Sequence, residues 1–299
     1  MLLRVLGTAA GGGLPQWNCA CPGCAGARRH PSRRRLHDSL AFHRTPTGPW
    51  FLANASPDVA EQLESHPTLR PGAGDARTPV VRVVLTDAEL DHTLGLLRLR
   101  EAARIEIWCT EPVRKALQIS FPLGRVLAPY TELTWHHLPS GTDAPPAVVA
   151  GLEVHAVPVS SKRPRYAADE AAHPAWSSAL RVRDPDSDRR AVYLPALAAW
   201  TDGLDDELAA ADCVLIDGTF LDEEEPRRTG FSERSASAMG HLPVLGPTGT
   251  ARRLHALGVR AHYTHLNNSN VLADPGAPER EHLAALGLDV AQDRMVIPL

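Results

Sequence analysis

The sequence predicts an α/β fold in a single domain that spans residues 1–299. Apolar segments with the composition of buried strands recur along the whole chain, at residues 2–6, 80–85, 105–109, 213–217 and 260–263. Helical patterns lie between them, at residues 112–117 and 248–257. No clear linker interrupts this alternation, so the strand-rich halves and their helices are expected to share one domain.

Shorter signals add detail to this prediction. Residues 39–42 with 50–54, and residues 178–183 with 191–194, have the patterns of two β-hairpins. Ser56 and Pro57 suit the cap and the first position of a helix. The tail, residues 286–299, is expected to add a closing pair of strands.

Composition limits the classes of function. A net charge of −4 and a pI near 6.4 argue against nucleic-acid binding, and the arginine-rich run at residues 28–35 is interpreted as a solvated surface. No apolar run approaches the ~18 residues of a membrane span, and the apolar start is too short for a signal peptide. Five cysteines, three of them clustered, suit a reducing compartment. We therefore expect a cytoplasmic protein with no membrane or nucleic-acid partner; its oligomeric state stays open.

The three clustered cysteines predict a structural zinc site. Cys19, Cys21 and Cys24 form Cys-x-Cys-x-x-Cys, and Pro22-Gly23 supplies the bend that turns the thiols toward one ion. Thiolates at this density select zinc. No fourth cysteine is near, so a residue distant in sequence must complete the site.

A second cluster of ligand-type residues follows the apolar segment 80–85. Asp87, Glu89, Asp91 and His92 come before a helical pattern that begins near Leu94. Acidic side chains between a buried strand and a helix are costly to desolvate, and a metal ion compensates that cost. The stretch therefore predicts a metal site at the end of the strand.

Two further strands end in residues of the same kind. Asp217 closes the segment 213–217, and His265 follows the segment 260–263. Separate strand ends on one sheet edge can converge on one ion, so Asp91, His92, Asp217 and His265 are the predicted ligands and catalytic residues. By contrast, His136, His137 and His155 alternate with apolar residues and are interpreted as surface or hydrogen-bonded core histidines.

One loop carries several cations. Lys162, Arg163 and Arg165 lie within four residues and suit an acidic substrate if the loop is close to the metal; otherwise they form only a solvated turn. We assign them, together with His241, to substrate binding.

Motifs along the whole chain carry a resemblance to known proteins. The pattern around Asp91-His92 resembles the His-x-His-x-Asp-His signature of the metallo-β-lactamase superfamily, with Asp87 and Glu89 in place of the first two histidines. A narrower set is similar to the coenzyme pyrroloquinoline quinone (PQQ) synthesis protein B family: Pro-Gln-Trp-Asn-Cys at 15–19, Asn-Ala-Ser-Pro-Asp at 54–58, Ile-Asp-Gly-Thr-Phe at 216–220, Met-Gly-His-Leu-Pro at 239–243 and His-Leu-Asn-Asn-Ser-Asn at 265–270. The resemblance implies a four-layer αββα sandwich and a role in making PQQ from a peptide-derived Glu-Tyr unit.

The family's role has been described as a carrier of PQQ or its precursor, or as an iron-dependent hydroxylase of the tyrosine ring. Compared with the superfamily signature, this sequence lacks two imidazoles, and a second zinc ion would lose its nitrogen ligands; this disfavours a dinuclear zinc hydrolase. The remaining set, His92 and His265 with a carboxylate of Asp91 or Asp217, resembles the ligands of non-haem Fe(II) oxygenases. We rank an Fe(II) hydroxylase first, with Zn or Mn as other possible metals, then a phosphodiesterase-like hydrolase, then a carrier. In related phosphodiesterases a histidine completes the zinc loop; Asn268 occupies that position here, so water, Asn268 or another histidine is the expected fourth ligand.

Overall fold

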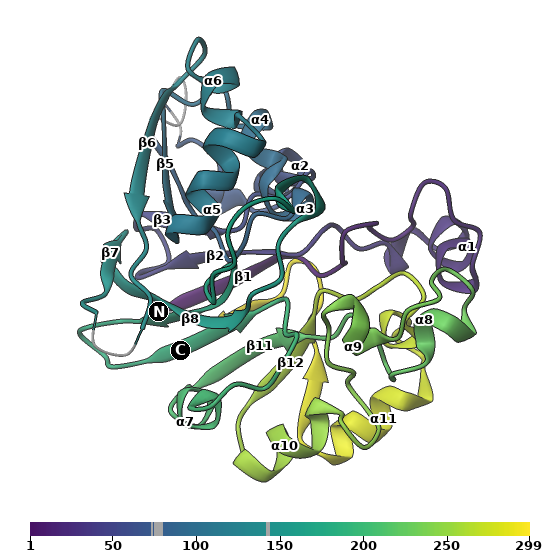
Figure 1. Cartoon of the computed structure of the whole chain (residues 1–299). Coiled ribbons are helices and arrows are strands. Elements are labelled where there is room, and N and C mark those ends of the chain that lie inside the picture. Colours follow the sequence, from purple (N-terminus) through teal and green to yellow (C-terminus); the bar gives the residue numbers. More distant parts are fainter. Residues whose placement is uncertain (73, 75–79, 142–143) are drawn as a thin grey trace.

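The computed structural model describes residues 1–72, 74, 80–141 and 144–299, and within them the chain forms two β-sheets packed face to face (Figure 1). The first sheet has the order β14-β1-β2-β3-β4-β5-β6. Its strands are β14 (Val296–Pro298), β1 (Leu2–Gly7), β2 (Ser39–His43), β3 (Trp50–Ala53), β4 (Val80–Val84), β5 (Arg104–Cys109) and β6 (Glu132–His137). Neighbours from β3 to β6 are parallel and the others are antiparallel.

The second sheet has the order β13-β12-β11-β10-β9-β8-β7. Its strands are β13 (Leu288–Val290), β12 (Ala261–Thr264), β11 (Cys213–Asp217), β10 (Arg190–Leu194), β9 (Ser177–Arg183), β8 (Leu152–Ser160) and β7 (Ala147–Val149). Strands β10 to β13 are parallel to one another, whereas β7 to β10 are antiparallel. Both predicted hairpins, β2–β3 and β9–β10, are present.

Helices cover the outer face of each sheet and complete the four αββα layers (Figure 1). The first sheet carries α2 (Val59–Glu64), α3 (Leu90–Thr93), α4 (Gly95–Arg98), α5 (Glu111–Lys115), the π-helical turn η3 (Ala116–Ser120) and α6 (Leu123–Leu127). The second carries α7 (Leu204–Ala209), α10 (Thr250–Leu257) and α11 (Pro278–Ala285). The connections contain α1 (Pro22–Arg29), α8 (Glu225–Arg228), α9 (Ala236–Met239) and the 3-10 turns η1 (Pro31–Arg33), η2 (Pro67–Leu69), η4 (Arg165–Ala167) and η5 (Val271–Ala273).

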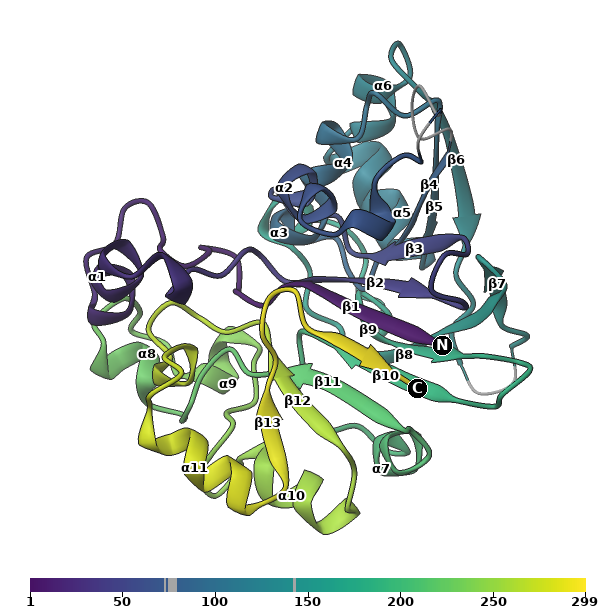
Figure 2. The ribbon, with the colours of Figure 1, turned by 180° about the vertical axis from the view of Figure 1, so that it is seen from behind.

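Successive side chains of a strand point to opposite faces of its sheet, and this alternation explains how the layers pack. In β11, Cys213 and Leu215 point into the core between the two sheets, whereas Val214 and Ile216 pack under the helices of the second sheet. Both faces of this strand are therefore buried, which is why its sequence is an unbroken apolar run. Seen from behind, α1 and its preceding loop lie at one side of the molecule, next to α8 (Figure 2). None of the described helices has the length and apolar composition needed to cross a membrane.

The structure corrects three local predictions. Helix α2 begins at Val59 rather than Pro57, because Ser56 uses its hydroxyl to bond the side chain of Gln62 and to accept from the amide of Asp58. A helical turn already begins at Leu90, before the predicted start near Leu94. The two strands of the tail do not pair with each other: β13 joins β12 in one sheet and β14 joins β1 in the other.

Candidate metal centre

The predicted ligands lie where parallel strands of both sheets end. Asp91 and His92 belong to α3, which follows β4 of the first sheet. His265 follows β12 of the second sheet, and Asp217 is the last residue of the neighbouring β11. Parallel strands present their carboxyl ends at one edge, so these side chains are brought to the same end of the sandwich.

Three of these side chains form one group. One ligand atom from each of Asp91, His92 and His265 lies within 4.8 Å of the other two. Oδ2 of Asp91 is 3.4 Å from Nε2 of His265 and 3.9 Å from Nε2 of His92. Ligand atoms around one ion with bonds of ~2.1 Å are separated by about 3–3.6 Å, so a small contraction would suffice for an ion to bind all three.

Asp87 orients the ring of His92. Its carboxylate oxygens lie 2.9 and 2.8 Å from Nδ1 of His92, so this nitrogen carries the proton and donates it. Within the described part of the chain, Nε2 of His92 is buried and has no hydrogen-bond partner. A buried nitrogen without a partner is costly unless an ion binds it, and a carboxylate behind the ring is the usual support of a ligating histidine.

His265 is held in the same way from the other sheet. The hydroxyl of Thr219 lies 2.6 Å from Oδ1 of Asp217 and 2.9 Å from Nδ1 of His265. The hydroxyl has one proton, which the short contact assigns to Asp217, so Nδ1 of His265 donates to Thr219. Nε2 of His265 faces Oδ2 of Asp91, to which it can donate in this structure, and it would become a metal ligand on losing that proton. Both histidines therefore offer the same nitrogen to the centre.

The charges of the group reinforce one another. Burial alone would lower the pKa of His92, but the carboxylates of Asp87 and Asp91 outweigh it and raise that pKa to about 10. Burial would raise the pKa of Asp91, yet His92 and His265 hold it well below its usual range. The buried carboxylates therefore favour a positive charge at this site. A metal ion can supply that charge in place of the protons on the histidines.

A second group contains Asp217, His241 and His265, whose ligand atoms also lie within 4.8 Å of one another. Here Oδ2 of Asp217 accepts from Nδ1 of His241 at 2.8 Å and from the amide of Leu197 at 2.8 Å. Its other oxygen accepts from Thr219 through both amide and hydroxyl. These hydrogen bonds account for the burial of Asp217 without an ion, so its direct role in this structure is to support His241 and Thr219.

A buried polar network stands behind the centre. Asp38 accepts from the hydroxyl groups of Tyr193, at 2.5 Å, and of Thr264. Asn54, with a positive φ of 66°, bonds Thr86 through both ends of its amide, at 3.0 Å each. This network ties the ends of β3 and β4 to the second sheet and explains the polar residues that follow those apolar strands.

The rim carries some of the predicted substrate-binding residues. Burial and Asp87 raise the pKa of half-buried Glu89, and the charge of Lys162 opposes this shift. The stem of Lys162 packs beside Gly240, where a Cβ would lie 2.7 Å from its Cδ. Arg163 bonds the carbonyl of Glu170 in its own loop, and Arg165 is exposed on η4.

The glycine loop lies against the centre, as a tight loop beside a crowded site. A Cβ on Gly11 would lie 3.1 Å from Oδ2 of Asp91, and one on Gly12 would lie 2.4 Å from the side chain of Gln16. Gly13 has a φ of +67°, which favours glycine. The absence of side chains here lets the backbone approach the ligand Asp91.

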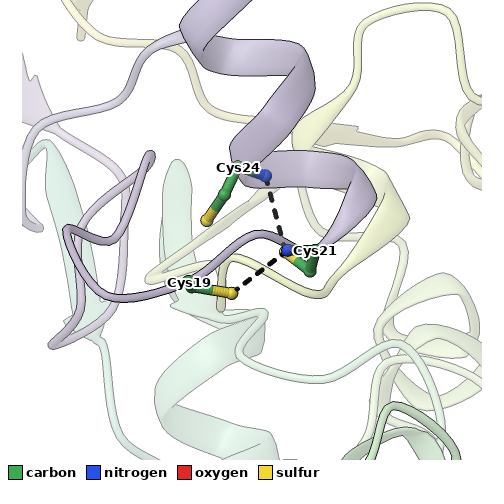
Figure 3. Close-up of side chains that lie close together, drawn as sticks. All are labelled: Cys19, Cys21 and Cys24. Atoms are coloured by element: carbon green, nitrogen blue, oxygen red, sulfur yellow. Dashed lines mark hydrogen bonds between the residues drawn. The ribbon is translucent and has the colours of Figure 1, made fainter.

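The cysteine loop forms a separate cluster. Cys19, Cys21 and Cys24 offer sulfur atoms within 4.8 Å of one another (Figure 3). Backbone amides donate to each sulfur: Cys21 to Cys19 at 3.4 Å, Cys24 to Cys21 at 3.4 Å and Gln16 to Cys24 at 3.3 Å. Amides that point at sulfur stabilise thiolates, so this loop has the donor set of a thiolate metal site.

Several roles were not visible in the sequence. The sequence shows Asp87 as a ligand-type residue in the position of a missing imidazole, whereas in the structure its carboxylate orients the ring of His92. Thr219 was part of a recognised motif, but nothing local indicated that it supports His265. Asp87 and Glu89 belong to neither ligand group among the residues that the structure describes, and neither do His136, His137 and His155.

Comparisons with known proteins agree with this architecture. A family model described as a β-lactamase superfamily domain matches residues 49–265. Coenzyme PQQ synthesis protein B of Azoarcus sp. (strain BH72) is 41% identical over 305 residues and is aligned over 100% of both chains. The protein of the same name from Methylococcus capsulatus (strain Bath) is 37% identical over 307 residues, again over 100% of both chains.

Solved structures extend the comparison. The crystal structure of Zn(2+)-bound PqqB from Methylobacterium extorquens has a TM-score of 0.88 at 30% identity and covers 100% of both chains. A diphosphatase from the PhnP family has a TM-score of 0.68 at 18% identity, over 100% of this chain and 97% of that one, which is a likeness of fold alone. The expected αββα sandwich is thus confirmed. The chain belongs to the β-lactamase superfamily and, within it, to the coenzyme PQQ synthesis protein B family.

Proposed function

We propose that this protein acts in PQQ biosynthesis as an Fe(II)-dependent oxygenase that hydroxylates the tyrosine ring of a peptide-derived Glu-Tyr precursor. The observation that carries the proposal is the group of Asp91, His92 and His265, in which one ligand atom from each of two imidazoles and one carboxylate lies within 4.8 Å of the other two. This donor set, with coordination positions left open, is typical of non-haem Fe(II) oxygenases. Its ligand atoms come from both sheets, so the folded sandwich itself fixes their spacing.

Each residue has a defined task in this proposal. His92 and His265 present Nε2 because Asp87 and Thr219 hold their Nδ1 protons. When bound there, Fe(II) would supply the open positions at which O2 is activated. One oxygen atom of O2 is inserted into a C–H bond of the ring to give a catechol, and the other becomes water with two protons from the medium and two electrons from an added reductant; any further product needs another such step.

The charge of the rim suits such a substrate. A Glu-Tyr unit carries carboxylates, and the positive charge of Lys162 acts on Glu89, which lies two residues before Asp91. Arg165 is exposed nearby in sequence, whereas Arg163 already bonds Glu170. Lys162 is therefore the cation we favour for direct contact with the dipeptide, with Arg163 and Arg165 as the remaining candidates.

The second metal of the proposal is a structural zinc at Cys19, Cys21 and Cys24, supported by the proximity of the three sulfurs. The thiols also fit a reducing compartment, and we place the protein in the cytoplasm.

Zinc or manganese in the active site, in place of Fe(II), would suit hydrolysis. A metal-dependent hydrolase is the second candidate, because Asp217 and His241 form a second ligand group together with His265, which the two groups share.

Oxygen consumption separates these functions. Protein purified without oxygen and loaded with Fe(II) is mixed with a Glu-Tyr dipeptide, O2 and a reductant; we expect oxygen uptake and a product heavier by one oxygen atom. His92→Ala should abolish both signals. A hydrolase would instead cleave a phosphodiester with Zn or Mn and without oxygen. A carrier would bind PQQ while leaving oxygen and dipeptide unchanged, and that result would refute the oxygenase.

A further inference from the structure

His37 forms a pair with Asp58 just before β2. Nδ1 of His37 lies 2.6 Å from Oδ2 of Asp58, and the backbone amide of His37 donates to the same oxygen at 2.8 Å. Asp58 precedes α2, where an aspartate commonly caps the helix, yet its side chain makes no cap hydrogen bond. Its carboxylate is used by His37 instead, so the fold favours this pair over the helix cap.

The other ring nitrogen of His37 contacts the glycine loop. Nε2 lies 3.2 Å from the carbonyl oxygen of Gly11. A Cβ on Gly13 would lie 3.2 Å from Cε1 of the ring, so the ring also packs against this residue. The backbone of His37 forms a bridge with Ala9, at the start of the loop. His37 therefore holds the glycine loop at several points.

Both contacts of the ring require a proton on its nitrogen. The Gly11 carbonyl can only accept a hydrogen bond. Burial would raise the pKa of Asp58, but its bonds to His37 outweigh burial and lower that pKa, so its carboxylate is ionised and also accepts. A neutral imidazole has one N–H and would turn a lone pair toward one of these two acceptors. The geometry therefore fits a doubly protonated, positively charged ring.

The other side of the glycine loop lies against a metal ligand. The position of a Cβ on Gly11 is 3.1 Å from Oδ2 of Asp91, so one Cα hydrogen of Gly11 points toward this oxygen. The loop is thus held between His37 and Asp91. We propose that His37, oriented by Asp58, is a positioning residue of the metal centre: it fixes the glycine loop, and the loop keeps Asp91 in the orientation that binds the metal. This inference rests on the metal that the proposed function places at Asp91 and is independent of the reaction.

The charge of the ring makes this support dependent on pH. Burial lowers the pKa of His37, but the hydrogen bond and charge of Asp58 at the start of α2, the charge of Asp91 in α3 and the Gly11 carbonyl outweigh burial and raise that pKa. When the pH rises through the raised pKa, the remaining proton stays on Nδ1 beside the carboxylate, and Nε2 turns a lone pair toward the carbonyl. The support of Asp91 is therefore present below the pKa of His37 and is lost above it.

Nuclear magnetic resonance tests the charge of the pair. The Cε1–H resonance of His37, identified by its absence in His37→Leu, should titrate above the usual ~6.5 in the metal-free protein. Asp58→Asn keeps the shape of the side chain and removes its charge, so the same resonance should titrate at a lower pH. Glu61→Gln removes an exposed carboxylate three residues further along α2; it is the matched control and should titrate as wild type. A wild-type pKa at or below ~6.5 would refute the charged ring.

Mn(II) titration without oxygen, with free Mn(II) measured by electron paramagnetic resonance, tests the effect on Asp91. Below the measured pKa of His37, we expect His37→Leu and Asp58→Asn each to bind about three- to tenfold more weakly than wild type. This loss is smaller than the ~10- to 100-fold typical of a group bonded directly to a metal ligand. The double variant should lose no more than either single variant, because both remove the same contact. Above that pKa, all of these proteins should bind alike.

The outcomes separate this inference from the proposed function. Wild-type protein that binds no Mn(II) would refute the metal centre and the inference together. If wild type binds Mn(II) and His37→Leu binds it equally well below the pKa, the metal centre stands and His37 does not position it. A loss of the same size at every pH, or additive losses in the double variant, would show that the ring only fills space, which also overturns the inference. If circular dichroism shows that His37→Leu is unfolded, Asp58→Asn, which retains the ring, decides between these results.

Discussion

Replacing Asp87 by asparagine tests the orientation of the active-site histidine. The substitution keeps the shape of the side chain and removes its charge. In the native structure both carboxylate oxygens lie within 2.9 Å of Nδ1 of His92. Asparagine offers one oxygen as an acceptor, and its NH2 group repels a protonated Nδ1 if the amide is turned around. The ring therefore loses a charge-assisted hydrogen bond, and its proton is no longer confined to one nitrogen.

The size of the effect follows from that bond. Hydrogen bonds to charged groups contribute about 1.5–3 kcal/mol, and about 1.4 kcal/mol corresponds to a factor of ten in affinity. Removing a partner behind a ligating histidine typically weakens metal binding by about 10- to 100-fold. We expect Asp87→Asn to weaken metal binding at Asp91, His92 and His265 within this range.

Manganese is the suitable probe, because Mn(II) prefers nitrogen and oxygen ligands and avoids the cysteine cluster. Free Mn(II) is measured by electron paramagnetic resonance during titration of the metal-free protein, with circular dichroism to check the fold. Glu89→Gln is the matched control: it removes the neighbouring carboxylate without touching the ring of His92, and its effect should be smaller. Unchanged binding in Asp87→Asn, or a larger loss in Glu89→Gln, would refute this role of Asp87.

Three further predictions follow from the same contacts. Thr219→Val removes the acceptor for Nδ1 of His265, so Mn(II) affinity should fall about tenfold; unaltered affinity would show that His265 is oriented by other groups. Burial raises the pKa of Glu225 from 4.5 to about 7, so its protonated form stabilises the fold below pH 4.5 and this contribution disappears as the pH rises toward 7. Glu225→Gln should therefore equal wild type in urea unfolding near pH 4.5 and exceed it by about 3 kcal/mol near pH 8, whereas parallel stability curves would contradict the shift. Lys162→Ala should raise KM for a Glu-Tyr dipeptide more than it lowers kcat, because its charge contacts ground and transition states alike; the opposite pattern in steady-state kinetics would argue against that contact.

The fold could be predicted from the sequence where the signals are local. Strands such as β11 and β5 are unbroken apolar runs because both of their faces are buried, and this pattern survives in the sequence. The ends of strands are equally visible, since polar residues follow them directly. The separation of β13 and β14 into different sheets was not predictable, because it depends on pairing with β12 and β1 from distant parts of the chain.

The same distinction applies to the candidate site. Asp91, His92 and His265 are recognisable because their residue types are unusual at the ends of buried strands. The supporting roles of Asp87 and Thr219 depend on distances between side chains of different loops, which no spacing in the sequence specifies. A substitution of histidine by aspartate at position 87 thus appears as a loss in the sequence, although in the structure it supplies the partner that a ligating imidazole needs.

Anomalous diffraction from Mn(II)- or Fe(II)-loaded crystals tests the central claim most directly, because it locates the metal and its ligands without reference to activity. We predict one ion in the active site, bound by the carboxylate of Asp91 and by Nε2 of His92 and His265. In that structure Asp217 should still hold the Nδ1 proton of His241. An ion bound by Asp217 and His241 but not by His92, or two ions of equal occupancy that share His265, would contradict the account.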